Sequence, residues 1–107
     1  RAEVETHQAY LLLKNIVQEV SELRNTAKRV DRTRWATELA YAVSECKSVI
    51  AYVCEAGGAS GHFQTSPLQR AARDVNTIGA HIVFDLDARL ELHGGALLGQ
   101  ELPGILV

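Results

Sequence analysis

Apolar side chains recur every three or four residues along the first part of the chain. This stripe consists of Ala9, Leu13, Ile16, Val20, Leu23 and Ala27. Polar residues, Glu19 and Glu22 among them, fall on the opposite side of the same helical projection. Such a period is typical of an amphipathic helix with one buried face. We therefore predict a long helix here, with Glu19 on its solvent side.

The same rhythm returns in a second segment, where the apolar face is wider. Its main row consists of Trp35, Leu39, Ala42, Cys46, Val49 and Val53, and a second row adds Ala36, Ala40, Val43 and Ile50. A wide apolar face implies burial against more than one neighbour. Gly57 and Gly58 follow, and glycine supplies the positive φ that a helix end favours. The second helix is therefore predicted to end at this pair.

The third segment begins at a clear helix-start signal. Ser66 can cap the helix, Pro67 suits its first position, and Gln69 can reach back to the cap. The apolar stripe that follows consists of Leu68, Val75, Ile78, Ile82, Leu86 and Leu90. We predict one continuous helix that Gly94 and Gly95 close.

The predicted fold class is all-α, an antiparallel bundle of long helices in a single domain over residues 1–107. Helices of about 25 residues are each about 37 Å long, and two of them have apolar faces wider than one partner covers. The first residue is Arg1 rather than methionine, which favours a piece of a longer protein. We therefore expect a missing partner: a fourth helix upstream of Arg1, a second subunit, or both.

Composition narrows the classes of function. A net charge of −2 argues against a basic nucleic-acid-binding surface, and the basic residues between Arg24 and Arg34 are interpreted as a solvated connector. No apolar run approaches the roughly 20 residues of a membrane span, and no export leader is recognisable. Cys46 and Cys54 would lie about 12 Å apart along one helix, too far for a disulfide. They are interpreted as small apolar residues in a reducing compartment, which favours a cytoplasmic location.

Candidate chemistry gathers in the third segment and the loop before it. Arg70, Asp74, Thr77 and His81 are spaced four, three and four residues apart, so they would share one helix face, with Arg73 beside them. Such a row is either an ordinary solvated face or a ligand-facing stripe. The preceding loop holds Gly57, Gly58 and Ser60, and the start of a helix bearing Arg70 suits a phosphate. The four histidines lack metal-ligand spacing, so no metal site is predicted.

Several of these residues, in this order, resemble a known family. They are Gly57, Gly58, Ser66, Pro67, Leu68, Gln69, Arg70, Arg73, Asp74 and His81. Together they resemble the C-terminal helical domain of acyl-CoA dehydrogenase-fold flavoproteins, without that domain's usual first helix. The segment from Gly94 to Gly99 is similar to the end of this domain in the family's monooxygenase branch.

Two positions separate the branches of this family. Many of its dehydrogenases carry a catalytic glutamate nine residues after the arginine that matches Arg73, and here that residue is Ile82. The two-component monooxygenases carry a histidine eight residues after it, and here that residue is His81. The resemblance implies a flavin-dependent monooxygenase that uses O₂ and reduced FMN, delivered by a separate reductase, to hydroxylate or oxidise a small organic substrate.

The same resemblance implies roles for individual residues. His81 would be catalytic, as an imidazole that donates or accepts a proton near neutral pH. The cofactor-binding residues would be Gly57, Gly58, Ser60, Arg70 and Arg73. Cys54 stands where the dehydrogenases have a glutamine that contacts FAD, which favours FMN over FAD.

Two alternatives remain open at this point. The chain is either the C-terminal domain of an FAD-dependent acyl-CoA dehydrogenase whose glutamate lies elsewhere, or a non-catalytic helical oligomerisation module. A homo-oligomer, dimer or tetramer, is expected in every case, because three helices cannot bury these apolar faces alone.

Overall fold

The computed structural model describes residues 1–56 and 67–101, and the described chain is entirely helical. Its elements are α1 (Ala2–Leu23), α2 (Arg29–Ala56), α3 (Pro67–Gly79), the 3₁₀ helix η2 (Ile82–Phe84) and α4 (Leu86–Leu97). No strand occurs in these two ranges. The predicted all-α class is thereby confirmed.

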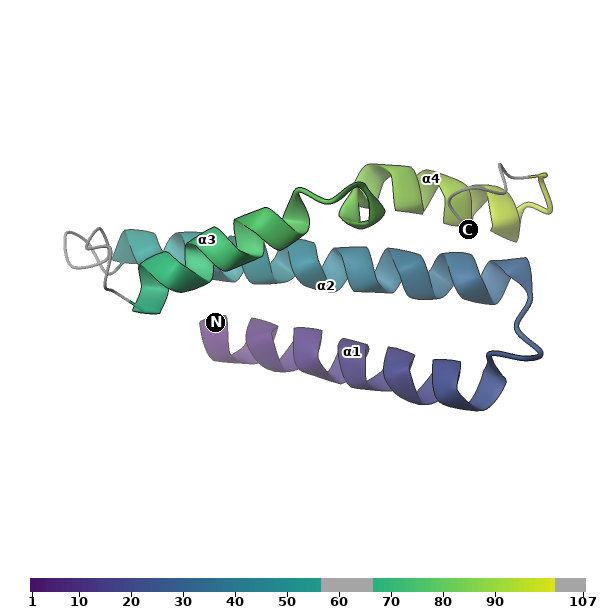
Figure 1. Cartoon of the computed structure of the whole chain (residues 1–107), viewed down its shortest axis with the longest axis horizontal. Helices are drawn as coiled ribbons and strands as arrows, with labels where there is room; N and C mark the ends of the chain where they lie inside the picture. Colours follow the sequence, from purple (N-terminus) through teal and green to yellow (C-terminus); the bar gives the residue numbers. More distant parts are fainter. Residues whose placement is uncertain (57–66, 102–107) are drawn as a thin grey trace.

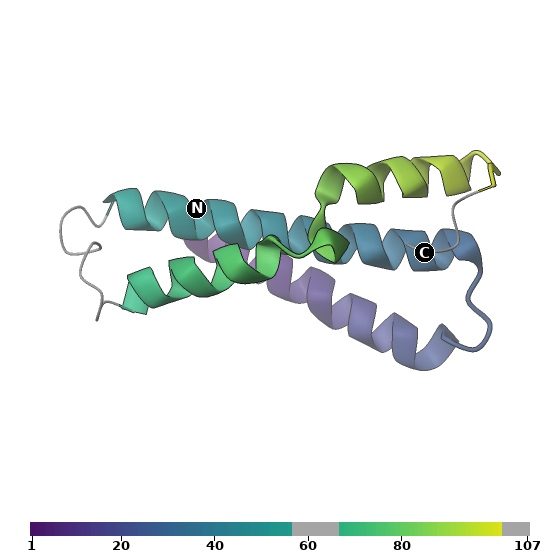
Figure 2. The same ribbon diagram turned by 45° about the horizontal axis from the view of Figure 1, so that its top comes forward.

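The long helix α2 is the axis on which the other elements pack. Figure 1 shows α1 antiparallel to α2 on one side, while α3, η2 and α4 follow one another along the other side. The molecule is accordingly elongated, about 50 × 25 × 21 Å. Figure 2 shows that α1 diverges from α2 toward the connector between them. None of the helices in the described ranges is long and apolar enough to span a membrane.

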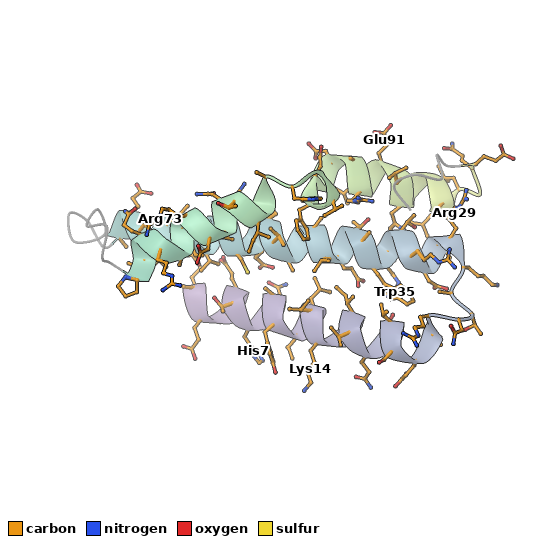
Figure 3. The ribbon with its side chains drawn as sticks, in the orientation of Figure 1. His7, Lys14, Arg29, Trp35, Arg73 and Glu91 are labelled. Carbon is orange, nitrogen blue, oxygen red and sulfur yellow. The ribbon has the colours of Figure 1, made fainter. Side chains whose placement is uncertain are left out.

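The contact between α1 and α2 is built from a small apolar core. The buried apolar side chains of the described chain are Ala9, Ile16, Trp35, Ala40, Ala42 and Val49. Trp35 is the largest of these, 8% exposed, and Figure 3 shows its side chain between α2 and α1. The first two predicted helices are confirmed, since these buried apolar residues fall on the predicted stripes.

Glu19 departs from its predicted place on the solvent side of α1. Its carboxylate accepts hydrogen bonds from the Trp35 indole (2.8 Å) and the Asn15 amide (2.9 Å), and it forms an ion pair with the Arg34 guanidinium. The indole nitrogen of a buried tryptophan needs an acceptor, and the long Glu19 side chain supplies it from the facing helix. The solvent-side interpretation was therefore wrong for Glu19.

Arg34 also departs from its interpretation as part of a solvated connector. The connector spans residues 24–28 only, because α2 already begins at Arg29. Arg34 joins Glu19 on α1 to Glu38 one turn further along α2, with one guanidinium nitrogen 3.2 Å from the Glu38 carboxylate. It thus fixes the pairing of the first two helices.

The predicted third helix is two helices. It begins at Pro67 as expected, but α3 ends at Gly79, and α4 begins only at Leu86. Asp85 restarts the helix by accepting a hydrogen bond from the Ala88 backbone N–H at 3.2 Å, which is the role of an N-cap. The Val83 carbonyl within the break accepts a hydrogen bond from Arg89 Nε at 3.0 Å. The break is therefore stabilised by specific polar contacts.

The break changes which residues of α4 face α2. Arg89 is buried (6% exposed), whereas Leu90, predicted on the apolar stripe, is 51% exposed. The Thr37 hydroxyl on α2 lies 2.9 Å from the Arg89 carbonyl oxygen, and the Thr33 hydroxyl lies 3.0 Å from His93 Nδ1. A polar seam of α2 threonines thus replaces the expected leucine contact, because the interruption resets the helical phase.

The end of α4 also differs from its prediction. Gly94 and Gly95 lie inside the helix, which continues to Leu97. The helix is terminated instead by Gly99, the residue of the described chain with a positive φ, 73°. The Gln100 N–H bonds to the Gly95 carbonyl at 2.9 Å, and the Gly99 N–H to the Ala96 carbonyl at 3.1 Å. This pair of bonds is the Schellman arrangement, which needs a left-handed residue at the position of Gly99.

The contacts of Glu19 predict a specific pH dependence of stability. Hydrogen bonds from Trp35, Arg34 and Asn15 lower the pKa of Glu19 to about 2, from an ordinary value of 4.5. Because the pKa is lower in the folded state, the stabilisation is complete above pH 4.5 and is lost as the pH falls toward 2. We expect Glu19→Gln to flatten this part of the pH profile, measured as the urea midpoint at each pH.

The control for this measurement is Glu22→Gln, on the exposed side of α1. It should leave the acid limb of the profile unchanged. Equal flattening in the two variants would show that the Glu19 cluster is not the source of the pH dependence.

The threonine seam predicts a second change in stability. Thr37 is 8% exposed, and its hydroxyl contacts the carbonyl oxygens of Thr33 (2.7 Å) and Arg89 (2.9 Å). We expect Thr37→Val, which keeps the side-chain shape, to lower the free energy of unfolding by about 1 kcal/mol. The exposed control Thr77→Val should change it by less than about 0.5 kcal/mol. Denaturant titration compares the two, and equal effects would contradict the assignment.

Candidate functional site

The two candidate arginines lie on α3, on its solvent side. Arg70 is in the first turn of α3; its side chain is 81% exposed, and its Nε lies 3.9 Å from the Asp74 carboxylate. Arg73 is exposed one turn further and is labelled in Figure 3. A surface ion pair at this distance holds Arg70 only weakly, so the guanidinium can turn to an incoming anion. The other predicted cofactor-binding residues, Gly57, Gly58 and Ser60, lie outside the described residues.

The spacing predicted that His81 shares a helix face with Arg70, Asp74 and Thr77. In the structure it does not. The helix ends at Gly79, so His81 lies in the bend between α3 and η2, and its side chain is exposed. Nine residues of helix, a rise of about 13 Å, separate Arg70 from Gly79. The arginines and the histidine are therefore at opposite ends of α3.

Two contacts fix the orientation of the His81 ring. Its Nδ1 accepts a hydrogen bond from the Val83 backbone N–H at 3.2 Å. The ring also meets the Phe84 ring edge to face, with centroids 6.4 Å apart and planes at 68°. Because Nδ1 is the acceptor, the neutral imidazole carries its proton on Nε2. The bend thus presents an N–H donor on an exposed, oriented ring.

A small cleft of about 270 Å³ lies beside this bend. It is lined by Val43, Ser44, Lys47, Ser48, Gly79, Phe84 and Leu86. Phe84 belongs to this lining and also contacts His81, so the cleft adjoins the histidine. Lys47 was not among the residues predicted from the sequence, because a lone lysine on a helix is ordinarily solvated.

A larger apolar groove runs between α1 and α3 above α2. It consists of two hollows, about 600 and 330 Å³, that share Thr6 and Tyr10. The second is lined almost wholly by apolar side chains, Leu13 and Ile78 among them, which are 43% and 51% exposed. The helical faces that the sequence predicted to need a partner are thus open along this groove.

The described residues offer few groups for metal or thiol chemistry. Within residues 1–56 and 67–101, no three His, Cys, Asp or Glu side chains are grouped so that they could hold a metal ion. Cys46 and Cys54 are both free. Burial, and to a smaller extent Glu45, raise the pKa of the Cys46 thiol, which disfavours the reactive thiolate.

Comparison with known proteins adds two matches. The family described as "Acyl-CoA dehydrogenase, C-terminal domain" matches residues 1–86. The oxygenase component of p-hydroxyphenylacetate 3-hydroxylase from Acinetobacter baumannii is 37% identical over 67 residues, which are 63% of this chain and 16% of that protein. The alignment thus covers about a sixth of the curated relative's length. No solved structure matches the chain.

Proposed function

Because this chain belongs to the family of acyl-CoA dehydrogenase C-terminal domains, we propose that it is the C-terminal helical part of a flavin-dependent monooxygenase. The complete enzyme would use reduced FMN and O₂ to hydroxylate or oxidise a small organic substrate. The similarity to an oxygenase component of a hydroxylase carries this proposal. Ile82, at the place of the dehydrogenase glutamate, and His81 just before it support the same branch.

The proposed catalytic residue is His81. The Val83 N–H holds its Nδ1, so the ring is oriented and Nε2 is left for proton transfer at the reacting group. The ring is exposed in this chain, and the proposal requires that other parts of the enzyme cover it. An uncovered imidazole would exchange protons with bulk water and would not protect a reactive group from hydrolysis.

The residues proposed to hold the flavin are Gly57, Gly58, Ser60, Arg70 and Arg73. Support comes from the exposed Arg70 guanidinium at the start of α3, where a helix N-terminus adds partial positive charge for a phosphate. When bound, the flavin supplies the electrons and activates O₂. FMN is favoured over FAD, and a separate reductase would deliver it in reduced form.

The proposed setting is a cytoplasmic homo-oligomer, dimer or tetramer. The open groove between α1 and α3 supports it, since apolar patches of this kind mark surfaces that another polypeptide covers. A further helix of the same enzyme, a second subunit, or both would fill it. If assembly were the only role of this chain, the chain would be the non-catalytic helical oligomerisation module considered above.

His81 provides the direct test of the proposal. In the flavin-loaded enzyme that contains this chain, we expect His81→Ala to lower the rate of product formation by about 10²- to 10⁴-fold. This is the usual contribution of a positioned acid or base. Asn76→Ala, at an exposed position on the same end of α3, is the matched control. Product formation and hydrogen peroxide release are measured together. Unchanged product formation in His81→Ala would favour the assembly module.

The dehydrogenase alternative makes a different prediction. An acyl-CoA dehydrogenase is reduced by its substrate, so adding an acyl-CoA without O₂ would bleach bound FAD. We expect no such bleaching, and we expect the enzyme to consume O₂ when supplied with reduced FMN. Bleaching by an acyl-CoA would replace the monooxygenase assignment with the dehydrogenase one.

A further inference from the structure

One carboxylate oxygen beside α1 is buried without a hydrogen-bond partner. It is Oε2 of Glu45, and in the described part of the chain no other buried side-chain nitrogen or oxygen lacks a partner. The carboxylate of Glu5, which lines the same cleft, is paired with Arg1 at 2.8 Å and accepts a hydrogen bond from the Tyr52 hydroxyl at 3.1 Å. A carboxylate oxygen that is shielded from water is unfavourable without a donor or a cation. The position of Glu45 therefore requires one partner more than the described chain supplies.

The cleft that Glu45 lines has a volume of about 380 Å³ and lies between α1 and α2. It shares no residue with the groove between α1 and α3. Its lining consists of Glu5, Gln8, Tyr41, Ser44, Glu45 and Ser48. This set includes two carboxylates and neither a lysine nor an arginine, and the Tyr41 side chain is 46% exposed. The cleft thus suits a cationic side chain that enters from outside, with an aromatic ring beside it.

The outer surface of α1 carries such a cation close to the cleft. Lys14 is exposed and forms no ion pair with any described residue, and Figure 3 shows its side chain on the side of α1 away from α2. Leu11, 50% exposed, lies midway: Gln8 in the cleft is three residues before it, and Lys14 is three residues after it. Residues three apart are neighbours on a helix surface. The cleft, the leucine and the lysine therefore form one continuous strip.

This strip is complementary to a second copy of itself. In a two-fold dimer the residue on the axis meets its own counterpart, and sites at equal distances on either side of the axis are exchanged. With Leu11 on the axis, Lys14 of each copy lies at the cleft of the other. The long, flexible lysine stem can carry its ammonium to the Glu45 carboxylate, and the two leucines bury apolar area against each other.

We propose that a second copy of this chain docks on this strip, with Leu11 on the two-fold axis and Lys14 of each copy paired with Glu45 of the other. This inference rests on the proposed homo-oligomer and identifies one of its interfaces. The groove between α1 and α3 is left for a further helix of the enzyme.

Charge reversal tests the proposal in the enzyme that contains this chain. We expect Lys14→Glu and Glu45→Lys each to raise the dimer dissociation constant by about a hundredfold or more, because each change places like charges together twice in a two-fold dimer. The double variant should return to within about tenfold of the wild type, since the pairs form again with reversed signs. Sedimentation equilibrium measures association, and circular dichroism checks that each variant is folded.

The matched controls are Lys28→Glu and Glu91→Lys, which reverse charges at exposed positions in the connector and on α4. They should leave the dissociation constant unchanged. A monomeric wild type, single variants that associate as it does, or a double variant no better than the single ones would overturn the proposal. Because association is measured without turnover, its failure and the failure of the oxygenase reaction are separately visible.

A cysteine on the axis supplies a second test that introduces no charge. Leu11→Cys brings two thiols together across the interface, so mild oxidation should give a covalent dimer on a non-reducing gel. Val17→Cys, at a position 61% exposed on another side of α1, should remain uncrosslinked. The wild type, which contains Cys46 and Cys54, sets the background. Equal crosslinking of the two variants would contradict the two-fold arrangement, and this test also decides the matter if a charge-reversed variant does not fold.

Discussion

Every other helix of the described chain packs on α2, and α2 offers different chemistry to each side. Toward α1 it presents Trp35 and Arg34, which Glu19 ties together through one carboxylate. Toward α4 it presents Thr33 and Thr37, which meet polar groups. Half of the buried apolar residues in the described ranges are alanines, and such small side chains specify little about how two helices are aligned. These polar contacts set the register of the bundle.

The sequence predicted the two long helices well, because a buried stripe on a continuous helix leaves a regular period. It also located the start of α3 at Pro67 and the end of α2 before Gly57. It missed the break after Gly79, since Ile78, Ile82, Leu86 and Leu90 keep a four-residue spacing across it. Periodicity cannot detect an interruption that happens to preserve the spacing of apolar residues.

The sequence predicted one helix face for Arg70, Asp74, Thr77 and His81, and the structure arranges them differently. Arg70 and Arg73 lie exposed on α3, whereas His81 lies in the bend after it, which the apolar period does not reveal. Buried Arg89, six residues further along, stabilises the bend by donating a hydrogen bond to the Val83 carbonyl. A single sequence does not reveal that Lys47 lines the cleft. It does so because its side chain passes close to Gly79, a residue far away in the chain.

The groove and the histidine are physically connected through the last turn of α3. Ile78 lines the groove and is 51% exposed, the next residue, Gly79, lines the cleft, and His81 follows in the bend. A polypeptide that covered Ile78 would therefore also approach the His81 ring. Covering the apolar face and excluding water from the imidazole would then be one event, driven by burial of apolar area. On this reasoning, a polar substitution at Ile78 that weakens coverage of the groove should also impair the chemistry proposed for His81, even though Ile78 touches no reacting group.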